Sequence, residues 1–355
     1  MLSNTTSDGS FYSTLINFTD IQAIEAKIAP LSYHLPKSSV IEGLPDGILA
    51  LIAPLVAYWT YSSFFHIIDE YKLAEKYRIH PSEEMLSRNR VSLPIVIRDV
   101  IFQHVIQSVM GYALYCIDPL PTTGYENFEM WQLRNKLPEW IPTTLIYLWY
   151  WYGQSLVRMF FAFLIIDSWQ FHLHRIMHLN KALYKRFHSR HHQLYVPYAY
   201  GALFNDPVEG FLLDTLGTGI ASLTTGMTPI ECTILYTFST MKTVDDHCGY
   251  SLPFDLFQLL FPNNSIYHDI HHQHFGVKYN FSQPFFTFWD TWFGTTYHGV
   301  DEYKTAQEKI TLQKYRQFLQ ERKNKRRNAA IAKKMPEPVS SSSDEDEDID
   351  EKKTN

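Results

Sequence analysis

The chain has 355 residues, of which 45% are hydrophobic and 15% aromatic, and only 19% are charged, against about 25% in average soluble domains. The net charge of −6 comes largely from an acidic C-terminal stretch and gives no reason to expect a nucleic-acid partner. The three cysteines form no CxxC pair and provide no disulfide framework, so these features exclude a small disulfide-stabilised secreted domain.

The N-terminal residues 1–43 are polar. Residues 1–26 contain no Lys or Arg and no sustained apolar run, so no secretory signal is evident. We predict that residues 1–43 form a lumenal segment, where the acceptor sequons at Asn4 and Asn17 would be usable.

A membrane region is predicted over residues 44–168, with three crossings. Residues 47–68 are apolar and carry no Asp, Glu, Lys or Arg, and they exceed the roughly 20 residues that a spanning helix needs. The second crossing is residues 100–117, where Gln103, His104 and Gln107 form a polar stripe that should face other helices. The third crossing is residues 143–166.

Charge bias gives these crossings a direction. Residues 69–93 carry five Lys or Arg residues and should be cytosolic, whereas residues 118–142 carry four acids and only two bases and should be lumenal. The basic residues that follow the third crossing then place the next segment in the cytosol. The N-terminus is accordingly predicted to be lumenal.

Residues 169–300 form a predicted histidine-rich domain. Eleven of the sixteen histidines lie between His172 and His274. An HX3H motif and two HX2HH motifs space their rings at i, i+3 and i+4, which on a helix places them on one face. Neutral imidazole is a common metal ligand, and one zinc site takes about four protein ligands. The number of histidines therefore predicts two metal ions, with these candidates: His174, His178, His188, His191, His192, His268, His271 and His272, and His247 as a possible ninth.

Two neighbouring histidines are excluded by position. His172 lies about 200° round a helix from His174 and should point elsewhere. His274 stands beside Phe275-Gly276, where a helix should stop, and is a weak candidate.

A second apolar region, residues 207–242, is broken at residues 226–229, and each half is short for a full crossing. We predict a hairpin that dips into the membrane and returns, which brings His247 and the second HX2HH motif to the same side as the first. Residues 301–355 read as a charged helix followed by a disordered acidic cytosolic tail. The final Lys352-Lys353-Thr354-Asn355 is similar to a dilysine endoplasmic reticulum signal.

The order HX3H, HX2HH, HX2HH resembles the fatty acid hydroxylase superfamily of membrane di-iron oxygenases. Further stretches, among them TMKTVDDHCGY and LFPNNSIYHDIHHQHFGVKYNFSQPFFTFWD, resemble the fungal sphinganine C4-hydroxylases over about residues 44–300. The resemblance implies hydroxylation of sphinganine, or of a dihydroceramide-type lipid, to the 4-hydroxy product in the endoplasmic reticulum membrane. It also implies two irons, molecular oxygen, and electrons from NAD(P)H through cytochrome b5 and its reductase. The implied ligands are His174, His178, His188, His191, His192, His247, His268, His271 and His272.

One position departs from related fatty acid 2-hydroxylases, which carry a further histidine where this chain has Thr243, so a tenth ligand is in doubt. Carboxylates commonly orient ligating histidines, and the candidates for that role are Asp167, Asp246, Asp269 and Asp290. The sequence assigns no residue to the substrate's polar head group.

Other functions stay open at this point. A sterol C4-methyl oxidase or a fatty acid 2-hydroxylase would carry the same histidine motifs. Imidazole also binds zinc, which could substitute for iron or support a membrane hydrolase. The chain has no HExxH motif, which speaks against the hydrolase. An inactive metal-binding scaffold would not need so many clustered ligands.

Overall fold

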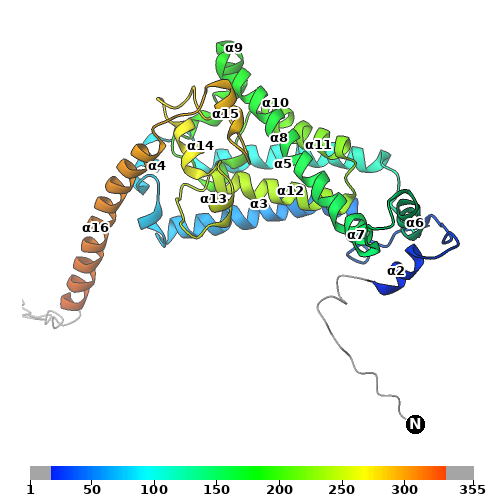
Figure 1. Cartoon of the computed structure of the whole chain (residues 1–355). Coiled ribbons are helices and arrows are strands. Elements are labelled where there is room, and N and C mark those ends of the chain that lie inside the picture. Colours follow the sequence, from blue (N-terminus) through cyan, green and yellow to red (C-terminus); the bar gives the residue numbers. More distant parts are fainter. Residues whose placement is uncertain (1–16, 333–355) are drawn as a thin grey trace, which may run out of the picture. The chain divides into compact units, whose positions relative to one another are not determined.

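The computed structural model describes residues 17–332 (Figure 1). The sequon at Asn4, the acidic tail and the terminal Lys-Lys pair lie outside the described residues. The chain divides into two compact units, the first ending at Thr311 and the second beginning at Leu312. Among the described residues the named secondary-structure elements are helices, apart from one antiparallel pair of two-residue strands, β1 (Leu35–Pro36) and β2 (Thr122–Thr123).

Three helical elements are long and apolar enough to cross a membrane, which confirms the prediction of an all-α membrane protein. The first is α3 (Asp46–Glu70) and the second is α5 (Leu93–Ile117). The third joins α7 (Thr143–Leu148), the π-helical turn η2 (Trp149–Gly153) and α8 (Gln154–Leu179) without interruption.

Two of these helices extend beyond the predicted limits. The second begins at Leu93 rather than at residue 100, because Pro94 occupies the first helical turn, where its missing N–H is not needed. The third was predicted to end at residue 166 but continues to Leu179, because no Pro or Gly occurs between residue 166 and Asn180. The first histidine motif therefore lies on the last turns of this membrane helix.

Large apolar side chains are exposed along all three helices. Examples are Val56 and Phe64 on α3, Val105 and Val109 on α5, and Leu156 on α8. Exposed apolar surface of this extent indicates contact with a membrane or a partner. A helix satisfies its own backbone hydrogen bonds, so lipid can contact these side chains directly.

The second apolar region forms a pair of helices with a turn between them. α11 (Gly217–Thr225) packs on α8, and α12 (Pro229–Asp246) packs along α3. Gly226 ends α11 in the left-handed conformation (φ +64°), which a residue without a Cβ adopts readily. Thr228 and Glu231 form a capping box that starts α12. The chain therefore turns back at the predicted position.

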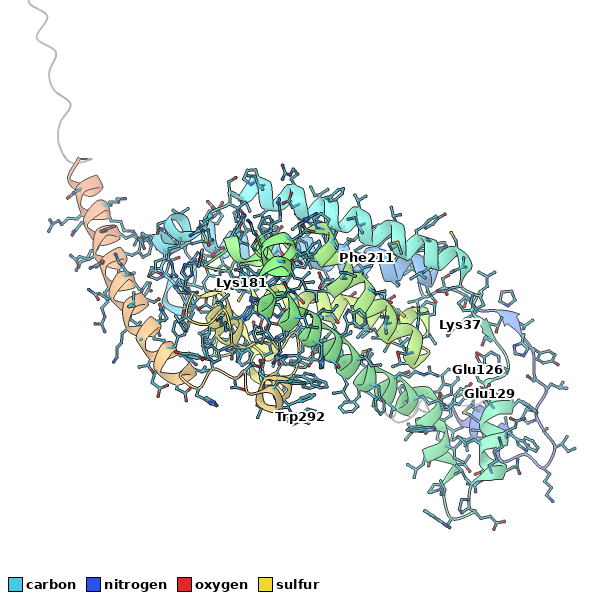
Figure 2. All side chains as sticks on the ribbon, turned by 90° about the horizontal axis from the view of Figure 1, so that it is seen from above. Lys37, Glu126, Glu129, Lys181, Phe211 and Trp292 are labelled. Atoms are coloured by element: carbon cyan, nitrogen blue, oxygen red, sulfur yellow. The ribbon has the colours of Figure 1, made fainter. Side chains whose placement is uncertain are left out.

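The remaining helices are short. Figure 2 shows Glu126 and Glu129 at one end of the first unit, well separated from Lys181, which follows α8. The acidic and basic loops therefore lie at different ends of the long helices. These short elements are α2 (Phe18–Ile24), η1 (Glu75–Tyr77), α4 (Ser82–Arg88), α6 (Glu126–Lys136), α9 (Lys181–Leu183), η3 (Tyr184–His188), η4 (His191–Gln193), η5 (Ala199–Leu203), α10 (Pro207–Gly210), η6 (Phe211–Leu216), α13 (Leu256–Leu260), α14 (Ser265–His272) and α15 (Phe288–Phe293), followed by the longer α16 (Val300–Ala332).

Candidate metal centre

The histidines come from four separate segments of the chain. His174 and His178 lie one turn apart near the end of α8. The next motif does not form an α-helix: His188 ends the π-helical turn η3, and His191 begins the 3-10 helix η4. A π-helical turn is rare and often marks a functional site.

The last motif lies on α14, a helix of eight residues that are all buried. Asn264 caps its first turn by accepting from the backbone N–H of Tyr267. His247 is the residue directly after α12, and its ring Nε2 lies 3.0 Å from that of His268. The hairpin of α11 and α12 therefore places His247 beside α14.

All nine predicted ligands lie in two groups, and within each group the potential ligand atoms are within 4.8 Å of one another. Each HX2HH motif divides between the groups, because its first and last histidines join one group and its middle histidine joins the other. Group 1 is His174, His178, His188, His192 and His271, and group 2 is His191, His247, His268 and His272.

The distances within the groups fit metal coordination. Two nitrogens that each lie about 2.1 Å from one metal ion are about 3.0 Å apart at a right angle and about 3.4 Å apart at the tetrahedral angle. In group 1 the Nε2 atoms of His174 and His188 are 3.0 Å apart. In group 2 the Nε2 atoms of His191 and His247 are 3.4 Å apart.

Hydrogen bonds on the outer side of the rings determine which nitrogen carries the proton. The Nδ1–H of His174 donates to the carbonyl of Phe281 at 2.8 Å, and that of His247 donates to the carbonyl of Thr243 at 2.8 Å. A neutral ring with a protonated Nδ1 has a bare lone pair at Nε2. The same pattern holds for three further rings: His191 to Phe204, His271 to Tyr279, and His272 to Leu194.

These lone pairs point at one another, an arrangement that is unfavourable unless a cation lies between them. The Nε2 of His271 is buried within group 1 and has no hydrogen-bond partner. A buried nitrogen of this kind costs free energy unless something binds it. The donor set therefore fits metal ions, with five imidazoles for one and four for the other.

The rings are neutral because they are buried and close together. Burial comes first, and nearby histidines second, in holding the pKa of His188, His192 and His268 well below the usual range. Burial also lowers the pKa of His247 to about 4. Neutral imidazole is the form that binds metal.

The four acids proposed to orient the ligands do not contact any of these histidine rings. Asp167 accepts from the backbone N–H groups of Phe285 and Phe286, and Asp246 pairs with Lys242. Asp290 accepts from the backbone N–H of Phe281, and the carbonyl of Phe281 accepts from His174. Asp290 therefore supports His174 only indirectly, through the backbone of Phe281. Asp269 pairs with His80.

Glu209 is the carboxylate that contacts a ring directly. Its Oε1 accepts from the Nδ1–H of His188, and the side chain is 1% exposed. Sequence reasoning missed Glu209 because its residue type and spacing do not distinguish it from other acids. It lies 21 residues beyond His188, on the short α10 that begins the hairpin.

The two excluded histidines lie apart from both groups. His172 is exposed, and its Nδ1 bonds to the carbonyl of Ser168. His274 is exposed and contacts the hydroxyl of Tyr195. Both exclusions agree with the geometry.

His80 is another buried histidine that sequence reasoning missed. Its Nε2 lies 3.1 Å from both carboxylate oxygens of Asp269, and its Nδ1 lies 3.1 Å from Glu84. The hydroxyl of Tyr303 also donates to Asp269, at 2.7 Å. Since Asp269 lies on α14 between His268 and Ile270, this cluster fixes the ligand helix from its outer side.

The His80 cluster predicts a pH-dependent stability. Burial lowers the pKa of His80, but Asp269 and Glu84 outweigh burial and raise the pKa to about 9. Because this value exceeds the 6.5 of an unfolded chain, the stabilisation is complete below pH 6.5 and is lost as the pH rises through about 9. The melting temperature of the purified protein should therefore fall between pH 6.5 and 9.5. The His80→Gln variant should show a lower melting temperature at pH 6.5 and a smaller fall, and equal falls would contradict the assignment.

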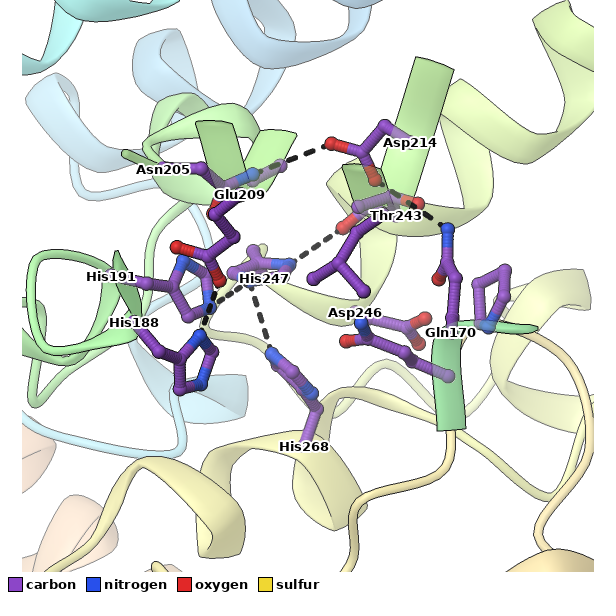
Figure 3. Close-up of a pocket in the computed structure, with 14 residues that line it drawn as sticks. Gln170, His188, His191, Asn205, Glu209, Asp214, Thr243, Asp246, His247 and His268 are labelled. Carbon is purple, nitrogen blue, oxygen red and sulfur yellow. Dashed lines mark hydrogen bonds and ion pairs between the residues drawn. The ribbon is translucent and has the colours of Figure 1, made fainter. Parts of the chain in front are cut away.

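A small polar chamber adjoins group 2 (Figure 3), and a larger apolar cavity adjoins that chamber. The polar chamber has a volume of about 20 Å³ and is bordered by His191, His247 and His268. The apolar cavity has a volume of about 280 Å³ and lies between α3, α5, α11 and α12. Four residues belong to the walls of both: Gln170, Asp214, Thr243 and Pro284.

Comparison with known proteins agrees with this geometry. The family model for fatty acid hydroxylases matches residues 159–295, which contain both groups of histidines. The sphingolipid C4-hydroxylase of Saccharomyces cerevisiae is 56% identical over 320 residues, which cover 90% of this chain and 92% of that protein. This chain belongs to the sphingolipid C4-hydroxylase branch of the fatty acid hydroxylase family.

Other members of the family are similar over most of their length. The sphingolipid C4-hydroxylase of Schizosaccharomyces pombe is 46% identical over 70% of this chain and 87% of its own. Sphinganine C4-monooxygenase 1 of Arabidopsis thaliana is 44% identical over the same two shares. No solved structure matches the chain. As a hydroxylase with two groups of buried histidines, this protein is a membrane-bound, metal-dependent monooxygenase.

Proposed function

We propose that this protein hydroxylates C4 of sphinganine, giving 4-hydroxysphinganine for sphingolipid synthesis. The observation that carries the proposal is the polar chamber, which borders group 2 and shares four wall residues with an apolar cavity among the membrane helices. The reacting carbon of a lipid can reach the histidines there while its alkyl chain stays in apolar surroundings. A sterol nucleus is rigid and broad, whereas the chamber that shares four wall residues with this cavity has a volume of only about 20 Å³, which favours a slender chain.

The metal ions in this proposal are two irons, held by the nine histidines of groups 1 and 2, with zinc as a possible substitute. Bound iron supplies one-electron and oxygen chemistry, with molecular oxygen as the oxidant and electrons delivered from NAD(P)H through cytochrome b5 and its reductase. Group 2 has one histidine fewer than group 1. Thr243, the position of the tenth ligand that is in doubt, borders both the chamber and the apolar cavity, so group 2 adjoins the proposed substrate site there.

The protein's own residues orient the centre and keep it dry. Backbone carbonyls hold the Nδ1 protons of five rings, so the Nε2 lone pairs face inward without any ring rotation. All nine rings are buried or nearly so, which excludes bulk water from the reacting carbon. The walls of the apolar cavity position the alkyl chain, which reduces the entropy cost of bringing C4 to the centre.

The proposed location is the endoplasmic reticulum membrane, with three crossings, a lumenal N-terminus, and the histidine groups and C-terminus in the cytosol. In this arrangement residues 1–43 are lumenal, residues 44–168 contain the crossings, residues 169–300 form the catalytic domain with the 207–242 hairpin, and residues 301–355 are cytosolic. The basic residues around Lys181 support a cytosolic position for the end of α8. Glycosylation mapping that placed residues 180–190 in the lumen would overturn this topology.

The function is tested by mass spectrometry of long-chain bases in cells with and without this protein. Cells that contain it should convert labelled sphinganine into 4-hydroxysphinganine, and cells without it should not. The conversion should stop when oxygen is removed, which a zinc hydrolase would not require. If the amount of 4-hydroxysphinganine is unchanged and the amount of 4-methylsterols or 2-hydroxy fatty acids is altered, the substrate is a sterol or a fatty acid instead.

A further inference from the structure

Three carboxylates line the polar chamber; Glu209 and Asp246 are buried and have clear partners, whereas Asp214 is half-buried. Asp246 pairs with the Lys242 ammonium, and Glu209 accepts from His188. The third, Asp214, has only two amide donors at the limit of hydrogen bonding: Asn205 at 3.4 Å and Gln170 at 3.5 Å. Within the described residues no Lys or Arg lies within ion-pair distance of Asp214.

An ionised carboxylate in such surroundings is costly. Removing a charge from water is compensated only by an opposite charge or by several good hydrogen bonds. Asp214 lies on the π-helical turn η6, which faces the junction of the polar chamber and the apolar cavity. Figure 3 shows its carboxylate with Asn205 on one side and Gln170 on the other, across from His247.

The size of the chamber limits what can occupy it. A volume of about 20 Å³ accommodates roughly one water-sized group. An ammonium or a hydroxyl fits this space, whereas the long acyl chain of a dihydroceramide does not. A second acceptor, the buried Oε2 of Glu209, lines the same chamber and has no hydrogen-bond partner.

We propose that Asp214 is the counter-ion for the C2 ammonium of a free long-chain base, whose alkyl chain occupies the apolar cavity. This inference rests on the proposed C4 hydroxylation. The amine nitrogen is three bonds from C4 and therefore at most about 4 Å from it. An ammonium held at Asp214 thus places C4 next to group 2, and Asp214 both selects the substrate and positions the reacting carbon.

The test uses the full-length protein in membranes, with two substrates that differ only at nitrogen: sphinganine, and the neutral amide N-acetylsphinganine. The Asp214→Asn variant should raise KM for sphinganine about 10-fold or more, because a charge-assisted contact is lost. For N-acetylsphinganine its KM should change less than about 2-fold. Asp245→Asn is the matched control, since Asp245 is a buried acid on α12 that bonds to Gln258 and lines neither cavity.

Competition against the unaltered protein provides a second measurement that does not depend on folding of the variant. Octadecane-1,3-diol has the chain and hydroxyls of sphinganine without the amine. About 10-fold more of it than of unlabelled sphinganine should be needed to halve the hydroxylation of labelled sphinganine. Equal competition, or equal losses for both substrates in Asp214→Asn, would overturn the role of Asp214 while leaving C4 hydroxylation intact. No 4-hydroxylated product from either substrate with the unaltered protein would instead overturn the proposed function.

Discussion

The His271→Ala variant is expected to abolish sphinganine hydroxylation while the protein still reaches the membrane. His271 is the one residue of α14 that joins group 1, and its ring is fully buried with Nε2 directed into the group. Loss of a residue that only supports a ligand costs about 10- to 100-fold. Loss of a ligand itself should therefore reduce activity below about 1% of the original.

This prediction is checked by measuring 4-hydroxysphinganine and bound iron for equal amounts of membrane-inserted protein. His172→Ala is the matched control, because His172 lies two residues from His174 but is exposed and outside both groups. The control should retain its activity and its iron. A His271→Ala protein with unaltered iron content and activity would show that group 1 does not need α14.

The second large effect is expected for Glu209→Gln. This change keeps the size of the side chain but removes the charge that stabilises the Nδ1–H of His188. Carboxylates in this position hold both the tautomer and the orientation of a ligating ring. Hydroxylation and iron affinity should each fall about 10- to 100-fold.

Iron affinity, measured by chelator competition, separates this role from a purely structural one. Glu231→Gln serves as the control, because Glu231 is a buried glutamate whose partners are Arg158 and the Thr228 cap. It should lower stability without lowering iron affinity. If both variants lost stability equally and kept their iron, Glu209 would have no positioning role.

Much of the membrane fold follows from local pattern alone. A run of more than 20 apolar residues predicts a spanning helix without knowledge of its neighbours, and all three predicted crossings are helices that are long and apolar enough to span a membrane. Their ends are less determined. Pro94 and the uninterrupted α8 extended two helices beyond the hydropathy limits, because helices end at caps and not where hydropathy changes.

The orientation of the histidines depended on contacts that are distant in sequence. The ring of His174 is held by the carbonyl of Phe281, and the ring of His272 by that of Leu194. A backbone carbonyl carries no residue-specific signal, so these partners cannot be predicted from residue type. The expectation that acidic side chains would hold the rings failed for all four candidates for this reason.

The sequence by itself predicted which histidines would come together, because histidine spacing is a local property, and eight or nine imidazoles exceed the needs of one metal ion. It also excluded His172, since two residues on a helix turn a side chain by about 200°. Only the tertiary structure decided the division into two groups. Adjacent residues such as His271 and His272 are about 100° apart on a helix, so they face different neighbours, and the packing of α14 against α8 and α12 selects which group each ring enters. Tertiary structure also decided that Glu209 and Asp214 lie beside the histidines. These two acids are on α10 and η6, and their positions depend on how the hairpin folds and not on any local pattern.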